Sequence, residues 1–159
     1  MTALLMALLA VAGSAAGTGT NDVSRITSRS VDFDRTEGVI MFAGDVKVDY
    51  PGYRMTSDEL FVFLKDTNRL SRVVALGNVT ISNETRVGYC DRATYNKGRN
   101  EVVMYPADKG KTVRLVDNGE NKSEVEGEKI TFWLDAEQVE IVNSRITVET
   151  GDDKRRFLP

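Results

Sequence analysis

The chain has 159 residues, of which 41% are hydrophobic and 28% are charged, and its formal net charge is −3. One domain with a single hydrophobic core fits this length, and the composition excludes a largely disordered chain. The mild negative charge argues against sequence-independent binding to nucleic acid, because such binding needs a broad positive field.

The first residues resemble a secretory signal peptide. An uncharged apolar run spans residues 3–12, and small residues follow at 13–16, as a signal peptidase requires. The run is shorter than the roughly 20 residues that a membrane-spanning helix needs, and no cysteine follows it as a lipid anchor. We expect a signal peptide over residues 1–16 and a flexible lead-in over 17–25. The basic start of a signal peptide is absent, so a misassigned start codon and an uncleaved membrane anchor are the alternatives.

Three short alternating segments come next and predict strands. Residues 26–34 alternate with a period of two and predict one strand. Residues 39–50 predict a second strand, which contains a Gly44-Asp45 step. A Pro-Gly turn separates it from a third alternating segment at 53–57.

The run from Glu59 to Leu64 is apolar on both faces, so periodicity alone does not separate helix from strand. Its short length, its aromatic and β-branched residues and the turn-forming residues 65–68 favour a strand. In a strand Phe61 and Phe63 lie on the opposite face from Leu60, Val62 and Leu64. They then need separate cover from a second layer or another molecule.

The same pattern is then repeated. Residues 70–81 contain a second glycine step, Gly77-Asn78, and an alternating segment with Asp91 follows. The distance from Gly44 to Gly77 is 33 positions, and Asp58 and Asp91 are separated by the same interval. Two landmarks at one offset indicate an internal repeat.

The rest of the chain predicts further short strands and a third, eroded copy of the repeat, in which residues 126–132 correspond to 57–62. Turns fall about every 8 to 12 residues, as in an all-β sandwich, barrel or solenoid. We expect one β domain over 26–149 and a charged, mobile tail over 150–159. The third copy begins over residues 124–134, and the remaining predicted strands are residues 102–105, 113–116, 139–142 and 145–149.

Few residues suggest chemistry. Histidine is absent, which removes the commonest general base and metal ligand. Gly44-Asp45 and Gly77-Asn78 lack the spacing of a phosphate-binding loop, and their glycines indicate strand kinks or bulges. Asp45, Asp58 and Asp91 predict local hydrogen bonds to backbone N–H groups. We expect no catalytic residue, metal site or cofactor.

Cys90 is the only cysteine, so no intramolecular disulfide can form. It occupies the place in the second repeat that Ser57 has in the first. This position predicts a small side chain packed inside a strand, and therefore a buried, unreactive thiol.

Alternating apolar residues of the repeats predict one continuous face. From the pattern alone this face is either an ordinary hydrophobic core or a surface that holds an apolar ligand. The residues of the face are Val46, Val48, Met55, Leu60, Val62, Leu64, Val79, Ile81, Ala93, Tyr95, Ile130, Phe132, Val139 and Ile141.

Three short segments of the sequence resemble the repeats of a known family. They are FAGDVKV at residues 42–48, SDELFV at 57–62 and ALGNVTI at 75–81. They are similar to the repeats of the OstA-like/LptA family of periplasmic lipopolysaccharide-transport proteins, F-x-G-N-V-x-V followed by A-D-x-L-x-V. The resemblance extends from about Ile26 to Val148. Asp45 stands where the family has Asn, and Ser57 and Cys90 stand where it has Ala.

The resemblance implies a fold and partners. The fold is all-β, with stacked antiparallel strands in an open folded β-jellyroll built from degenerate repeats of about 33 residues. Its interior holds the acyl chains of lipid A, so the resemblance makes the apolar face described above the lipid-binding lining. Free edge strands imply pairing with inner- and outer-membrane transport proteins and a head-to-tail homo-oligomer. Lys47, Arg54, Arg72, Arg86 and Arg92 are available as basic rim residues.

The resemblance favours a periplasmic lipid-binding bridge component of lipopolysaccharide export to the outer membrane, with no catalytic step. A membrane-anchored partner of the LptC type in the same pathway is one alternative. A secreted structural or adhesive β-repeat protein without a lipid ligand is another. An enzyme is the least favoured class, because histidine is absent.

Overall fold

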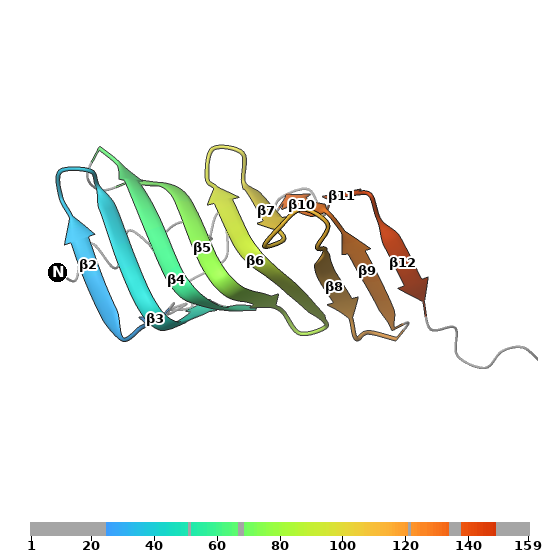
Figure 1. The fold of residues 1–159 in the computed structure, drawn as a ribbon. Coiled ribbons are helices and arrows are strands. Elements are labelled where there is room, and N and C mark those ends of the chain that lie inside the picture. Colours follow the sequence, from blue (N-terminus) through green and yellow to red (C-terminus); the bar gives the residue numbers. More distant parts are fainter. Residues whose placement is uncertain (1–24, 51, 67–68, 121, 134–137, 149–159) are drawn as a thin grey trace, which may run out of the picture.

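In the computed structural model, residues 25–50, 52–66, 69–120, 122–133 and 138–148 are described. They form twelve strands of one open antiparallel sheet, which confirms the predicted all-β class (Figure 1). The predicted signal peptide, nearly all of the lead-in and the charged tail lie outside these residues. Within them, no helix is long and apolar enough to cross a membrane.

Four long strands form a meander in the N-terminal part of the sheet: β3 (Val39–Tyr50), β4 (Tyr53–Lys65), β5 (Arg69–Ser82) and β6 (Arg86–Asn96). The run from Glu59 to Leu64 therefore belongs to a strand, as predicted. The shorter strands are β1 (Arg25–Thr27), β2 (Ser30–Asp34), β7 (Glu101–Tyr105), β8 (Val113–Asp117), β9 (Ser123–Gly127), β10 (Lys129–Trp133), β11 (Gln138–Val142) and β12 (Arg145–Val148).

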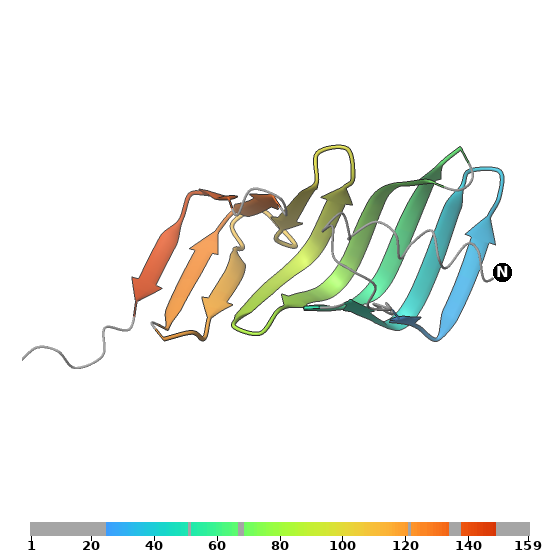
Figure 2. The same cartoon turned by 180° about the vertical axis from the view of Figure 1, so that it is seen from behind.

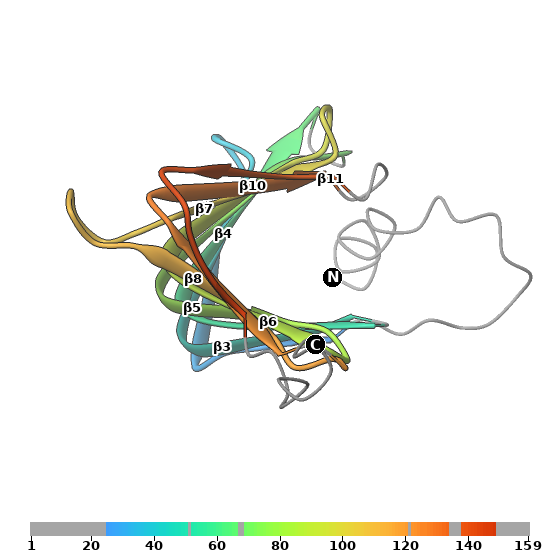
Figure 3. The same ribbon diagram turned by 90° about the vertical axis from the view of Figure 1, so that its right-hand side faces the viewer.

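Three of the four register shifts in the long strands lie on one line across them. They lie between Ala43 and Val46, between Thr56 and Glu59, and between Leu76 and Val79, while the fourth, between Phe63 and Leu64, is near the end of β4. The shifts coincide with the predicted kinks at Gly44-Asp45 and Gly77-Asn78. At this line the sheet bends into the open V seen end-on in Figure 3.

The bend separates two half-sheets. Half-sheet A contains β2, residues 39–43 of β3, 59–65 of β4, 69–76 of β5, 92–96 of β6, and β7, β10 and β11. Half-sheet B contains β1, the other halves of β3 to β6, and β8, β9 and β12. The strands follow one another along the long axis of the molecule, with β2 near one end and β12 near the other (Figure 2).

The predicted strand over residues 26–34 is wrong in one respect, because it is two strands. β1 pairs with half-sheet B, where Ile26 lies opposite Val48, and β2 pairs with half-sheet A, where Val31 lies opposite Phe42. The chain crosses the bend between them, and the backbone N–H of Arg29 donates to the carbonyl of Gly44 at 2.9 Å.

Paired left-handed residues make the bend at β5. Gly77 has φ +78° and Asn78 has φ +48°, conformations that glycine adopts freely and asparagine tolerates. The carboxylate of Asp58 lies over Gly77 and accepts a hydrogen bond from Asn78 Nδ2 at 2.9 Å.

The same arrangement recurs along the bend with different chemistry. In β3 the side chain of Arg29 covers Gly44 and forms an ion pair with Asp45, which accounts for an acid where the family repeat has Asn. In the eroded third copy, Asn143 Nδ2 donates to Glu128 Oε2 at 2.9 Å. The predicted local role of Asp45 and Asp58 is therefore structural, but their partners are side chains rather than backbone N–H groups.

Candidate functional site

The inner faces of the two half-sheets enclose an apolar groove. Half-sheet A contributes two rows of directly opposed side chains, one beginning Phe42–Leu60–Ala75 near the bend and one beginning Ile40–Val62 nearer the opening. Half-sheet B contributes a facing row that begins Ile26–Val48–Met55. The first row continues through Ala93, Met104, Ile130 and Ile141, the second through Val73, Tyr95, Val102, Phe132 and Val139, and the third through Ile81, Gly88, Leu115, Val125 and Ile146.

All the residues predicted to line an apolar face lie on this inner surface. The most enclosed are Val46, Leu60, Val62, Val79 and Ile130, each with at most 1% of its surface exposed. They belong to two clusters of packed side chains, one under β3 to β6 and a smaller one around Met104, Val113 and Ile130. Val139, near the open end of the groove, is 44% exposed.

A hollow of about 430 Å³ lies between the half-sheets. Of the predicted lining residues, Ile81, Ile130, Phe132 and Val139 reach it. Its walls come from β4, β5, β6 and β8 on one side and β7, β10 and β11 on the other. The other lining residues are Tyr53, Ser82, Asn83, Arg86, Gly88, Met104, Leu115, Trp133 and Gln138.

Gly88 explains where the hollow lies. It is the one position in the row of half-sheet B, between Ile81 and Leu115, that has no side chain. A Cβ atom at residue 88 would come within 2.7 Å of Met104 Cε. The methionine therefore extends into the space that the glycine leaves, and methionine is flexible enough to adapt to different occupants.

The rim of the hollow is polar at the edge of half-sheet B. Arg86 Nε donates to Asp117 Oδ2 at 3.0 Å. The backbone N–H of Gly119 and, next, the side chain of Arg86 stabilise the Asp117 carboxylate and lower its pKa. Asn83 Oδ1 accepts hydrogen bonds from the backbone N–H groups of Thr85 and Arg86. The arginine is thus held beside an apolar floor.

The other predicted rim cations do not face the groove. Lys47 lies between the inward-facing Val46 and Val48, and strand alternation places it on the outer face. Arg54 pairs with Asp49 on that face at 2.8 Å. Arg72 and Arg92 lie over the rings of Phe63 and Tyr105 on the outer face. Strand pleating therefore leaves Arg86 as the one predicted rim cation that lines the hollow.

Cys90 packs against both core clusters and lies opposite Val79. Burial, with a smaller effect from the neighbouring Asp91, raises the pKa of its thiol from 9.0 to about 12. The thiol is therefore protonated and unreactive at neutral pH, as its place in the repeat predicted, although Cys90 is half-buried rather than fully buried.

Sequence reasoning missed Gly88, Met104, Leu115 and Trp133. Residues 102–105 were predicted to form a strand, but a continuous apolar run gives no face assignment without a polar alternate. Leu115 could have been found from the sequence, because strand alternation places it on the same face as Val113. Gly88 gave no signal, because its importance depends on Met104 from another strand.

Comparison with known proteins defines the family. The family model described as "LptA/(LptD N-terminal domain) LPS transport protein" matches residues 25–138, which is most of the chain. The chain belongs to this family. No curated protein matched the sequence. The match covers both half-sheets of the N-terminal part and the strands that enclose the hollow up to Gln138, the first residue of β11.

A solved structure supports the fold independently. The chain is similar to the crystal structure of LptH from Pseudomonas aeruginosa, described as the LptA-homologous periplasmic component of a lipopolysaccharide transport device, with a TM-score of 0.64 and 19% identity. The alignment covers 82% of this chain and 96% of LptH. The bent LptA-type sheet is thus the fold of both proteins.

Proposed function

We propose that this protein is a periplasmic bridge component of lipopolysaccharide export and that its groove holds the acyl chains of the lipid. The observation that carries the proposal is the hollow, which has an apolar floor that includes Ile81, Met104 and Phe132, beside a rim with Arg86. An acyl chain moved from water into such a floor is stabilised by about 0.8 kcal/mol per buried CH₂. A cation at the rim suits the anionic part of an amphiphile.

The proposal assigns the carrier role to the whole inner surface, including the enclosed residues of half-sheet A and the face of half-sheet B with Val46, Val48 and Met55. Side chains of the N-terminal cluster are closely packed, so acyl chains are expected to enter first at the hollow. Met104 and Met55 can then adjust to the chain, since unbranched side chains repack readily.

Photo-crosslinking tests this proposal. A photoreactive residue at Ile81 or Phe132 is expected to form adducts with lipopolysaccharide in a host that makes it. The same residue at Lys47, on the outer face of β3, and at Lys97, in the β6–β7 turn, provides the matched controls. Adducts at the two hollow positions and none at the controls support the carrier role. Equal labelling at all four positions, or no lipid adduct at any of them, would refute the carrier role.

We also propose that the free ends of the sheet join the chain to its partners. β12 ends half-sheet B, and Ile146 and Val148 on it are 62% and 52% exposed. At the other end, Val31 of β2 is 62% exposed. Edge strands with exposed apolar residues invite pairing with another strand. The partners are further copies, head to tail, and the inner- and outer-membrane transport proteins.

The end-to-end contact is tested by Ile146→Lys, because a charged residue on an edge strand discourages pairing. Sedimentation at increasing protein concentration is expected to show growing assemblies for the unmodified protein and markedly shorter ones for the variant. The control is Arg145→Lys, which keeps the charge on the same strand. Assemblies of equal length for the two variants contradict the edge model.

A further inference from the structure

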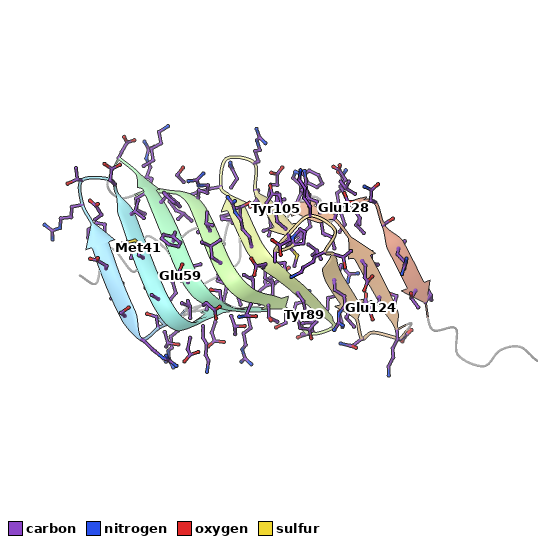
Figure 4. The ribbon with its side chains drawn as sticks, in the orientation of Figure 1. Met41, Glu59, Tyr89, Tyr105, Glu124 and Glu128 are labelled. Atoms are coloured by element: carbon purple, nitrogen blue, oxygen red, sulfur yellow. The ribbon has the colours of Figure 1, made fainter. Side chains whose placement is uncertain are left out.

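The outer faces of the two half-sheets differ in chemistry. On half-sheet B the outer row reads Lys47–Thr56–Thr80–Tyr89–Arg114, an ordinary polar surface. On half-sheet A the outer rows are largely apolar: Met41, Phe61 and Val74 lie directly opposite one another, with Leu76 and Phe63 beside them. Figure 4 views this convex face and shows Met41, Glu59 and Tyr105 on it.

We name these neighbouring residues the outer patch: Met41, Phe61, Phe63, Val74, Leu76 and Tyr105. No described element packs over the patch as a second layer. Its residues are half-buried, apart from Val74, which is only 7% exposed. Arg72 shields Phe63, with its guanidinium carbon 4.2 Å from the ring centroid. Contiguous apolar surface of this kind marks an interaction site.

The charges around the outer patch are also distinctive. On the outer face of half-sheet B, acids and bases pair within the chain, as Asp49 does with Arg54 and Glu124 with Arg114. Around the patch, Glu59, Arg72 and Arg92 form no ion pair with any residue in the described ranges. The patch therefore carries unpaired charges of both signs on its rim.

We propose that the outer patch binds a second copy of this chain, face to face, through a two-fold contact. A surface with acids and bases at once does not suit a partner of a single charge sign, such as an anionic membrane, but it suits a copy of itself. Glu59, Leu76 and Arg92 lie in one row, on β4, β5 and β6 respectively. A two-fold axis along β5 places β4 of one copy opposite β6 of the other, and so brings Glu59 opposite Arg92 of the second copy.

The contact packs Leu76 near the axis and covers Phe61, whereas Val74, which is 7% exposed, contributes little surface. Two sheets pack in this way when their apolar faces meet about 10 Å apart with strands nearly aligned. The contact is lateral, so it leaves the groove and the free ends of the sheet open. It does not depend on the proposed lipid ligand or on end-to-end assembly.

The first test uses protein purified from cells that express the whole coding chain, with Ile146→Lys present to suppress end-to-end pairing. Sedimentation equilibrium is expected to show a reversible dimer. Glu59→Arg and Arg92→Glu should each weaken it by at least about tenfold, because each brings like charges together. The double variant should restore it, because both cross-copy pairs are then reversed. A monomer at every concentration, or single variants that dimerise as well as the parent, would overturn the proposal.

The second test is geometric. Two copies of Leu76→Cys should be joined by a bifunctional thiol reagent that spans about 10 Å, since the two residues face each other near the axis at the separation of packed sheets, which is too wide for a direct disulfide. The matched control is Thr80→Cys on the same strand but on the polar outer face of half-sheet B, and it should remain monomeric. Equal cross-linking of the two variants overturns the two-fold contact. Lipid crosslinking at Ile81, measured on the same charge variants, should be unchanged, so a failure of this proposal and a failure of the carrier role are distinguishable.

Discussion

The bend of the sheet depends on Gly77, and Gly77→Ala is the sharpest test of that view. An alanine at φ +78° is destabilised by about 1–2 kcal/mol, because the left-handed region brings its Cβ close to the following carbonyl. The new Cβ would also lie 3.0 Å from Asp58 Cβ and Cγ. The Asp58 side chain must then move and lose its bond to Asn78, which adds about 1 kcal/mol. We expect a total loss of about 2–3 kcal/mol.

Urea denaturation monitored by circular dichroism measures this loss. With an m-value of about 1.5 kcal/mol/M, the midpoint should fall by roughly 1.3–2 M without a change of slope. Gly110→Ala is the matched control, because Gly110 has φ +88° and no atom within 4 Å of its added Cβ. Gly110→Ala should lose only the roughly 1–2 kcal/mol that comes from placing alanine in the left-handed conformation. Equal midpoints for the Gly77 and Gly110 variants would refute the claim that the Asp58 contact stabilises the bend.

Three further outcomes are expected. Leu60→Ala removes a side chain that is 1% exposed and should destabilise the protein by about 2–5 kcal/mol in the same urea assay, whereas Ile146→Ala, at an exposed site, should change stability by less than about 0.5 kcal/mol. Gly88→Val displaces Met104 and fills the hollow, so lipid adducts at Phe132 should decrease while the fold, checked by circular dichroism, is retained; undiminished adducts contradict a ligand in the hollow. Because the Cys90 pKa rises from 9.0 to about 12, its thiolate fraction at pH 8 is roughly 1000-fold lower than that of an exposed thiol, and a thiol reagent should label it only after unfolding. The free energy of unfolding should decline as pH rises from about 9 towards 12, because the thiol of the unfolded chain ionises first. Cys90→Ala should remove that part of the decline.

The sequence predicted the local architecture well where the pattern within a single strand was sufficient. Alternation placed Val62 and Ile81 on the same inner surface, because successive side chains of a strand point to opposite faces. The recurring glycine steps located the bend, since two left-handed residues interrupt a strand wherever they occur. Continuous apolar runs were less informative, and the face of Met104 stayed unassigned for that reason.

The pairing of strands from distant parts of the chain could not be predicted from the sequence. β6 pairs with β7 along one half and with β8 along the other, and β7 continues to β10. The sequence between β7 and β8 does not encode that division, because it depends on which half of β6 each strand pairs with. The hollow follows from it, since Gly88 and Met104 meet only across the two half-sheets.

The orientation of charged residues was decided in the same way. Arg72 and Arg92 were equally available to a rim or to an outer surface when only spacing was known. Their strands fix them on the convex face, over Phe63 and Tyr105, while Arg86 alone of the predicted rim set lines the hollow. The sequence by itself thus determined the repeats, the bend and the apolar inner face, because these depend on neighbours within one strand. Only the tertiary structure decided where the groove is hollow and what lies on its outer side, because both depend on contacts between strands far apart in the chain.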